Sequence, residues 1–169
     1  MELLKNFFIQ RIVKKKNTPL LSVNHDTIRT IGLVIDIQEK DRTEEIIKEL
    51  VACGFKKNQI YLLQYTKRKK KEQKEINHLL SLKEVSWKGE IVHTFTNKFI
   101  QTPFDLLINY YDLEKMPLLL VTLFSKANFK VGFASVGKEI NHLSVDTKPE
   151  KVHTFVEELV KYLNILNKL

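Results

Sequence analysis

Several predicted strands are followed by polar side chains that could bind a small molecule. Open parallel sheets bind ligands in the crevice outside the carboxyl ends of their strands, where we expect these residues. Carboxylates and tyrosines together can hold a sugar, a base or, through their oxygens, a metal ion. The candidate pocket residues are Asp36, Asn109, Tyr110, Asp112, Ser135 and Asp146. The alternative is that the acids only begin turns or cap helices, as Asp commonly does.

A run of cations is the second candidate site, because residues 66–75 contain six basic side chains. Adjacent cations repel one another, and a phosphate backbone relieves that repulsion while it releases counterions. Three aromatic residues nearby, Tyr61, Tyr65 and Trp87, could stack on bases. The predicted nucleic-acid contacts are Lys14, Lys15, Lys16, Lys67, Arg68, Lys69, Lys70, Lys71 and Lys74. The alternatives are a solubilising loop and a contact with an acidic protein.

The net charge of +8 is unevenly distributed along the chain. Basic and acidic residues balance in residues 104–169, so the whole excess lies in residues 1–103. This asymmetry favours an anionic partner for the first part of the chain, with nucleic acid ahead of an acidic membrane surface. We therefore expect RNA or a ribonucleoprotein surface as the partner.

The sequence lacks the common motifs of nucleotide-binding and hydrolytic enzymes. It has no glycine-rich dinucleotide fingerprint, no P-loop and no Gly-x-Ser-x-Gly elbow, and it contains only five glycines. The five histidines show no zinc-ligand spacing, and one cysteine is too few to help them. We predict no cofactor, no metal site and no catalytic residue, and a binding protein rather than an enzyme.

The single cysteine and the hydropathy pattern bear on the compartment. Cys53 cannot form an internal disulfide, and we expect it to be a buried apolar filler at the end of a helix. Residues 1–13 do not resemble a secretory signal, and no apolar run approaches the roughly 18 residues of a membrane span. The expected setting is the cytoplasm.

The candidate residues need a parallel sheet to bring them together, and the apolar pattern predicts one. Residues 103–133 read as a buried strand, a crossover helix and a second buried strand, which is one βαβ unit. Residues 30–36, 41–53 and 59–65 form a second such unit. We predict a three-layer α/β domain over residues 27–169, Rossmann-like or flavodoxin-like, with a mostly parallel sheet of about five strands.

The remaining elements are less regular. A short helix is expected over residues 95–100. Residues 79–87 and 91–95 show no dominant period and read as short irregular or strand pieces. Residues 143–146 read as a last short strand. The final helix is predicted to start at Thr147, which would cap it, with Pro149 in its first turn.

Residues 1–26 are predicted to form a basic amphipathic helix followed by a linker. The apolar residues Phe7, Phe8 and Ile12 recur at helical spacing, with cations on the other side. Three interpretations of the apolar face remain open: it packs on the domain, docks on a partner protein or an RNA-rich surface, or lies on a membrane surface.

Two segments carry a family resemblance: Phe-Asp-Leu-Leu-Ile-Asn-Tyr-Tyr at 104–111 and Ser-Lys-Ala-Asn-Phe-Lys-Val-Gly-Phe at 125–133. With them, the chain from about residue 28 to residue 169 resembles a family of short uncharacterised proteins from Bacteroidota bacteria. The resemblance implies shape and a cytoplasmic setting but no activity.

Residues 104–133 also resemble the amino-terminal domain of heptosyltransferase-type glycosyltransferases, in which an Asp-Leu-Val-Ile strand precedes a helix and an Ile-Gly-Phe strand. The chain departs from that pattern because it has no nucleotide-sugar-binding domain and no glycine-rich opening after the first strand.

Three functions follow as hypotheses. The first is a non-enzymatic protein whose basic first part contacts RNA or a ribonucleoprotein. The second is a nucleotide- or sugar-binding, or glycosyltransferase-like, domain that uses the strand-end crevice. The third is an interaction module that docks through the helix of residues 1–26.

Overall fold

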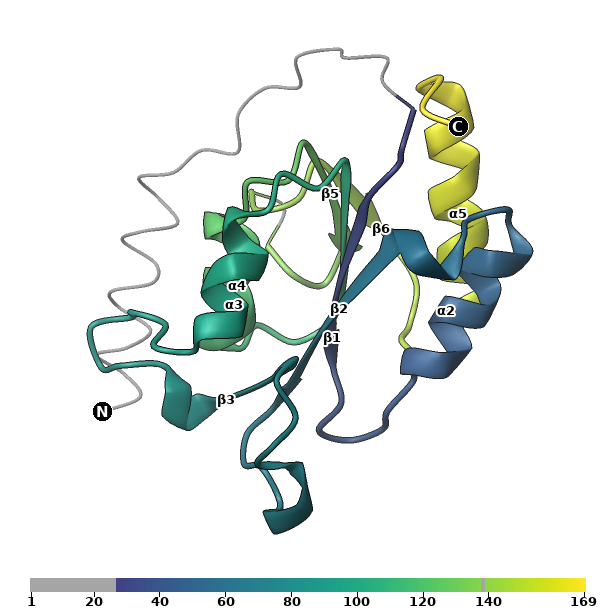
Figure 1. The fold of residues 1–169 in the computed structure, drawn as a ribbon. Helices are drawn as coiled ribbons and strands as arrows, with labels where there is room; N and C mark the ends of the chain where they lie inside the picture. The colour runs from purple at the N-terminus through teal and green to yellow at the C-terminus, as the bar shows by residue number, and fades with distance from the viewer. Residues whose placement is uncertain (1–26, 138) are drawn as a thin grey trace.

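One parallel sheet of six strands runs through the described part of the chain, residues 27–137 and 139–169 of a computed structural model (Figure 1). The strands are β1 (Ile31–Asp36), β2 (Ile60–Thr66), β3 (Leu79–Ser81), β4 (Leu106–Tyr110), β5 (Phe129–Phe133) and β6 (Leu143–Val145). The predicted helix and linker of residues 1–26 lie outside the described residues, so that helix and its docking role stay predictions.

The strand order is β3-β2-β1-β4-β5-β6, and every neighbouring pair is parallel. The chain builds the sheet outward from β1 to β3 and then returns to the other side of β1 to add β4, β5 and β6. This is the order of the doubly wound dinucleotide-binding folds. The predicted α/β, Rossmann-like class is therefore confirmed, with six strands where about five were expected.

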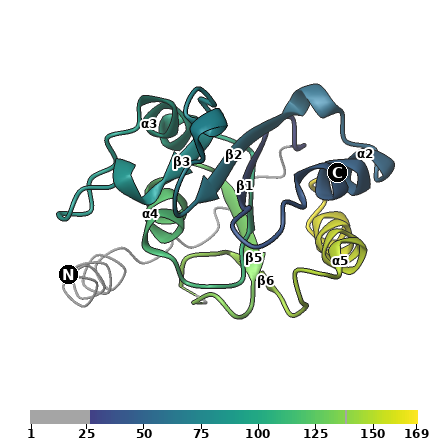
Figure 2. The same cartoon turned by 90° about the horizontal axis from the view of Figure 1, so that it is seen from below.

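Helices cover both faces of the sheet, which gives the three predicted layers (Figure 2). The helices are α2 (Thr43–Ala52), α3 (Thr94–Gln101), α4 (Met116–Phe124) and α5 (Val152–Ile165). α2 and α5 pack together on one face, and α3 and α4 pack together on the other. None of these described helices is long and apolar enough to cross a membrane.

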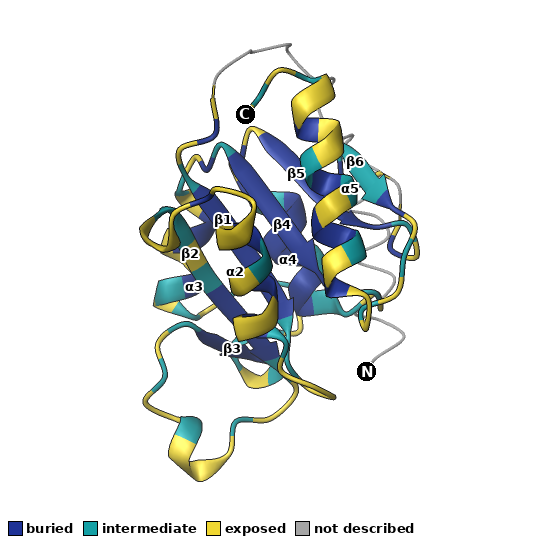
Figure 3. Cartoon of the chain, turned by 90° about the vertical axis from the view of Figure 1, so that its right-hand side faces the viewer, coloured by how far each residue is buried: buried dark blue, intermediate teal, exposed yellow. Residues whose placement is uncertain are grey.

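The strands separate two apolar cores, because successive side chains of a strand point to opposite faces. Ile31, Leu33 and Ile35 pack against α2 and α5, whereas Val34 packs with α3 and α4. Burial is nearly complete along β1, β4 and β5, as Figure 3 shows. Continuous burial on both faces is what made these strands recognisable as apolar runs.

An aromatic cluster holds α5 on the sheet. The rings of Tyr110, Phe133 and Phe155 lie with centroids 4.8–5.0 Å apart, and two of the three pairs meet edge to face. Such geometry places the positive edge of one ring against the negative face of another. The cluster joins the ends of β4 and β5 to the first turn of α5.

The beginning of α5 differs from the prediction. The helix starts at Val152, so Thr147 does not cap it and Pro149 precedes its first turn. The main-chain carbonyl of Pro149 accepts a hydrogen bond from the Tyr110 hydroxyl at 2.7 Å, and the Lys151 amide donates to the Lys148 carbonyl. These bonds hold residues 148–151 as a turn.

One further expectation about the first half of the chain is corrected. Cys53 lies at the predicted end of α2, but its side chain is exposed rather than buried. Residues 79–81 form an edge strand, in agreement with the short irregular or strand pieces predicted there. The connection from β2 to β3 contains only a short 3₁₀ turn, Lys71–Gln73, where a crossover helix is usual.

Gly32 provides a test of this packing at the centre of the sheet. A Cβ atom on Gly32 would lie 2.8 Å from a ring carbon of Phe104 and 2.9 Å from a methyl carbon of Leu107. We expect Gly32→Ala to lower the free energy of unfolding by about 1–3 kcal/mol, because well-packed cores resist added atoms. Urea denaturation measures the change.

Gly137→Ala is the matched control, since its new Cβ would meet only the side-chain oxygen of Glu114, at 3.3 Å. That flexible side chain can move away, so we expect little change. Equal stability of the two variants would contradict the described packing.

Candidate functional site

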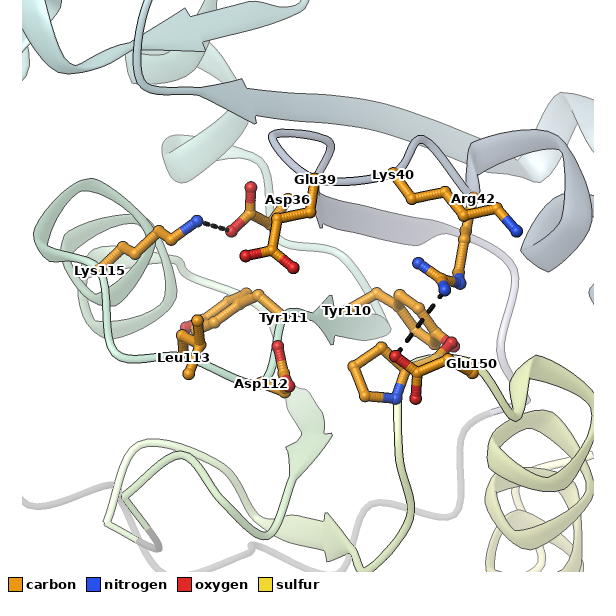
Figure 4. A pocket seen from close by; sticks show the side chains of 11 residues that line it. Asp36, Glu39, Lys40, Arg42, Tyr110, Tyr111, Asp112, Leu113, Lys115 and Glu150 are labelled. Atoms are coloured by element: carbon orange, nitrogen blue, oxygen red, sulfur yellow. Dashed lines mark hydrogen bonds and ion pairs between the residues drawn. The ribbon is translucent and has the colours of Figure 1, made fainter.

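A pocket of about 80 Å³ opens where the strand order reverses, between the carboxyl ends of β1 and β4 (Figure 4). Connections leave these two strands toward opposite faces of the sheet, and ligands of doubly wound folds bind in the gap between them. Most of the side chains that line the pocket are polar. Those discussed below are Asp36, Arg42, Tyr110, Asp112, Lys115 and Glu150.

An ion pair closes one side of the pocket. The Lys115 ammonium, at the start of α4, donates to Asp36 at the end of β1 and lies 3.4 Å from the side-chain oxygen of Gln38. The other carboxylate oxygen of Asp36 accepts the Gln38 amide at 3.0 Å. Burial, with a smaller contribution from Asp36, raises the pKa of the nearby Tyr65 hydroxyl to about 12. Asp36 and Lys115 are thus tied to each other in the described structure.

Arg42, the residue before α2, lies on the other side (Figure 4). Its nearest acid is Glu150, with 3.9 Å between guanidinium nitrogen and carboxylate oxygen. The Tyr110 ring stands between β4 and this pair, and its hydroxyl donates to Pro149. Burial raises the pKa of Tyr110 well above its ordinary value; Arg42 opposes the increase, while Glu150 and Asp112 add to it. Tyr110 therefore stays a neutral donor near neutral pH.

The structure brings together three of the six predicted pocket residues. Asp36, Tyr110 and Asp112 line the same pocket. Ser135 is exposed, and its hydroxyl donates to the main-chain carbonyl of Asp112 at 2.8 Å. Asp146 is also exposed, follows β6 and does not line the pocket.

Asn109 belongs to a buried polar network rather than to the pocket lining. Its amide nitrogen donates to Asn141 at 2.8 Å, and its oxygen accepts the Thr122 hydroxyl at 2.8 Å. The Thr122 oxygen lies 2.6 Å from the Tyr111 hydroxyl, which also lies 3.3 Å from the Leu118 carbonyl. These bonds join β4 to α4 and to the segment before β6, so the structure gives Asn109 a packing role.

A second polar site lies beside β3, where the cations that follow β2 meet the residues that follow β3. An open cleft of about 620 Å³ is lined by Arg68, Lys69, Lys74, Ser81, Lys83 and Glu84. Four of these six residues are cations and one is an acid. Lys83 was not predicted, because it is separated in the sequence from the cationic run and only the pairing of β3 with β2 brings it there.

Glu84 organises one wall of this cleft. Its carboxylate accepts the Lys69 ammonium at 2.9 Å and both the amide and the hydroxyl of Ser81, at 2.7 and 2.9 Å. His93 lies 3.6 Å away. Burial opposes ionisation of Glu84, but these donors outweigh it and hold its pKa below the ordinary value. Burial also lowers the pKa of His93, more than Glu84 raises it.

The other predicted phosphate contacts differ in how exposed they are and in whether they already form an ion pair. Lys67, Arg68, Lys70, Lys71 and Lys74 are exposed, whereas Lys69 is tied to Glu84. Lys14, Lys15 and Lys16 lie outside the described residues.

The three aromatic residues near the cationic run also differ. Trp87 and Tyr61 are about half exposed or more, at 62% and 49%, but Tyr65 is buried and so cannot stack on a base as expected. In the described part of the chain, no three His, Cys, Asp or Glu side chains are placed to hold a metal ion.

The buried network gives a prediction for Thr122→Val. The substitution keeps the shape but removes the hydroxyl that bonds Asn109 and Tyr111, and buried polar groups without partners are costly. We expect the free energy of unfolding to fall by about 1–3 kcal/mol in urea denaturation. Thr102→Val is the control, because its hydroxyl bonds the Lys98 carbonyl at a partly exposed position. Similar losses in both variants would refute a special role for the network.

The lowered pKa of Glu84 gives a pH-dependent prediction. Its ionised form contributes stability above the ordinary pKa of 4.5, and that contribution is lost as the pH falls through the lower pKa of the folded state. Glu84→Gln should therefore destabilise the protein at about pH 7, and the difference should shrink in acid. Urea denaturation across this range measures it. Glu72→Gln, an exposed acid on the connection between β2 and β3, is the control; a difference independent of pH would contradict the assignment.

Comparison with known proteins identifies a family but not an activity. No curated protein and no solved structure is similar enough to the chain to count as a match. One family profile does match, over residues 5–166, and the predicted membership of a family without an assigned activity is confirmed. The assignment to Bacteroidota and the likeness to heptosyltransferases stay predictions. The chain belongs to DUF6913, a family of unknown function.

Proposed function

We propose that the protein binds the phosphate backbone of RNA, free or in a ribonucleoprotein, through the basic cleft beside β3. The observation that carries the proposal is the convergence of Arg68, Lys69, Lys74 and Lys83 on one open cleft. The exposed Lys67, Lys70 and Lys71 lie on the same connection as Arg68 and Lys74 and add to its positive charge.

Three of the four cations of the cleft are not neutralised by the described part of the chain. Glu84 is the acid of the cleft, and it is already occupied by Lys69 and Ser81. Arg68, Lys74 and Lys83 form no ion pair with a described residue. Phosphates would relieve the repulsion among these side chains, and the release of condensed counterions would add to the binding free energy.

The cleft favours a long polyanion over a compact one. The cleft is open, and its cations are flexible lysines and an arginine. Trp87, on the connection that follows β3, is an exposed ring close in sequence to Lys83, on which a base could stack. Phosphate contacts fix position but carry no sequence information. We therefore propose binding with little sequence preference, in the cytoplasm, with Lys14, Lys15 and Lys16 as additional contacts.

Fluorescence polarisation with a mixed-sequence, single-stranded RNA tests the proposal. About four phosphate contacts predict a loss of affinity of roughly 50-fold between 50 and 200 mM salt. The variant Arg68→Gln/Lys74→Gln/Lys83→Gln should bind at least about tenfold more weakly at the lower salt. These side chains are exposed, so the fold should not change.

The matched control is Lys48→Gln/Lys57→Gln/Lys151→Gln, which removes the same charge from exposed positions outside the cleft. It should retain most of the affinity. No binding at the lower salt, or equal losses in the two triple variants, would sink the proposal.

A further inference from the structure

The guanidinium of Arg42 is largely buried but has no close hydrogen-bond acceptor among the described residues. The side chain is 13% exposed, and its nearest acid, Glu150, is a 66% exposed side chain at 3.9 Å, beyond hydrogen-bonding distance. A guanidinium has five N–H donors, and those of Arg42 donate to no described residue. Covered donors normally have acceptors, so this one is suited to an anion that enters the pocket.

Asp112 offers the complementary group in the same pocket. Its main-chain carbonyl is held by the Ser135 hydroxyl, which fixes the loop after β4. Its carboxylate accepts no hydrogen bond from a described residue, unlike that of Asp36, whose two oxygens are used by Lys115 and Gln38. Figure 4 shows Asp112 and Arg42 on different sides of the pocket, with Tyr110 between them. A donor group on a ligand would therefore find a free acceptor at Asp112.

The size of the pocket limits the ligand. The enclosed space of about 80 Å³ corresponds to only a few water-sized groups at roughly 10–15 Å³ each, which favours a small ligand. A nucleotide or a nucleotide sugar is several times larger. The segment between β1 and α2 also contains no glycine, so it lacks the close backbone approach that dinucleotide sites use.

The charge of the pocket limits the ligand further. Four acids and three cations line it, and one of the cations, Lys115, is already paired with Asp36. A dianionic phosphate would meet more repulsion than attraction here. Glu39 and Lys40 form no ion pair with a described residue, but they are exposed. Arg42 and Asp112, by contrast, are partly buried. A monocarboxylate that also carries a positive or neutral donor matches Arg42 and Asp112.

We propose that this pocket binds a small amino acid or hydroxy acid, with its carboxylate on Arg42 and its ammonium or hydroxyl group on Asp112. The site is separate from the basic cleft, because none of its lining residues lines that cleft. Tyr110 fills the floor between the two anchors, and its hydroxyl is occupied by Pro149. Binding here is therefore independent of RNA binding.

The test is an NMR titration of the full chain, labelled with ¹⁵N, against L-alanine, L-lactate, acetate and inorganic phosphate. Alanine or lactate should give saturable shifts of the amides around Arg42, Tyr110 and Asp112. Acetate should bind more weakly because it lacks the donor, and phosphate should leave these amides unshifted. The difference between alanine and lactate tells which donor the site prefers.

Three variants assign the contacts. Arg42→Gln should weaken binding by about 10- to 100-fold, the usual effect of losing a hydrogen bond to a charged group. Asp112→Asn should weaken binding of alanine more than that of lactate, because an ammonium needs the charge. Glu150→Gln should strengthen binding by about two- to fivefold, since it frees Arg42 from a weak ion pair.

Glu150→Gln keeps the test decisive if Arg42→Gln fails to fold, because Glu150 is exposed and makes no hydrogen bond to a described residue. Lys83→Gln in the basic cleft is the control and should leave the titration unchanged. The proposal is overturned if neither alanine nor lactate shifts the pocket amides, if phosphate binds there more tightly than both, or if Glu150→Gln weakens binding.

Discussion

The central position of β1 is the constraint on which the rest of the structure depends. β1 has a parallel neighbour on each side, so the chain has to leave it toward one face and leave β4 toward the other. The loops that follow these strands cannot pack on each other, and the pocket is the space between them. The ion pair of Lys115 with Asp36 spans this gap and fixes α4 against the end of β1. The reversal of strand order at β1 therefore creates a pocket, although the loop after β1 has no glycine-rich motif from which the pocket could be predicted.

The polar residues at the carboxyl edge fall into two groups that composition does not distinguish. Lys69 and Lys115 have carboxylate partners and hold segments together. Among the described residues, Arg42 is largely buried but has only a distant acid, and Lys74 lines an open cleft and forms no ion pair. A cation with a short-range acceptor stabilises the fold, whereas one without an acceptor is available to a ligand. Within the pocket and within the basic cleft, this difference distinguishes the cations that hold the wall together from those that can bind a ligand.

Local patterns predicted the elements better than the site. β1, β4 and β5 are buried on both faces, so their apolar runs were plain, and the helices that cross between them followed from length and period. The strand order was not predictable, because it depends on where the chain goes after β3. Asn109 was misplaced for the same reason, since its partner Asn141 lies 32 residues away and no local pattern joins them. Arg42 was missed because a basic residue at a helix start is unremarkable in sequence. Only the structure shows that its acidic neighbour is Glu150, which precedes α5, and that the two form a weak ion pair.

The two outermost strands of the described sheet, β3 and β6, are also its shortest, with three residues each. An edge strand exposes unpaired amide and carbonyl groups, and these can recruit an edge from another molecule. Three residues offer only a few such groups, too few for a stable intermolecular ladder. The cations that follow β2 stand next to one of these edges and would repel an identical edge that approached it. The short edges, and the cations beside β3, thus both act against edge-to-edge pairing of two copies of the chain.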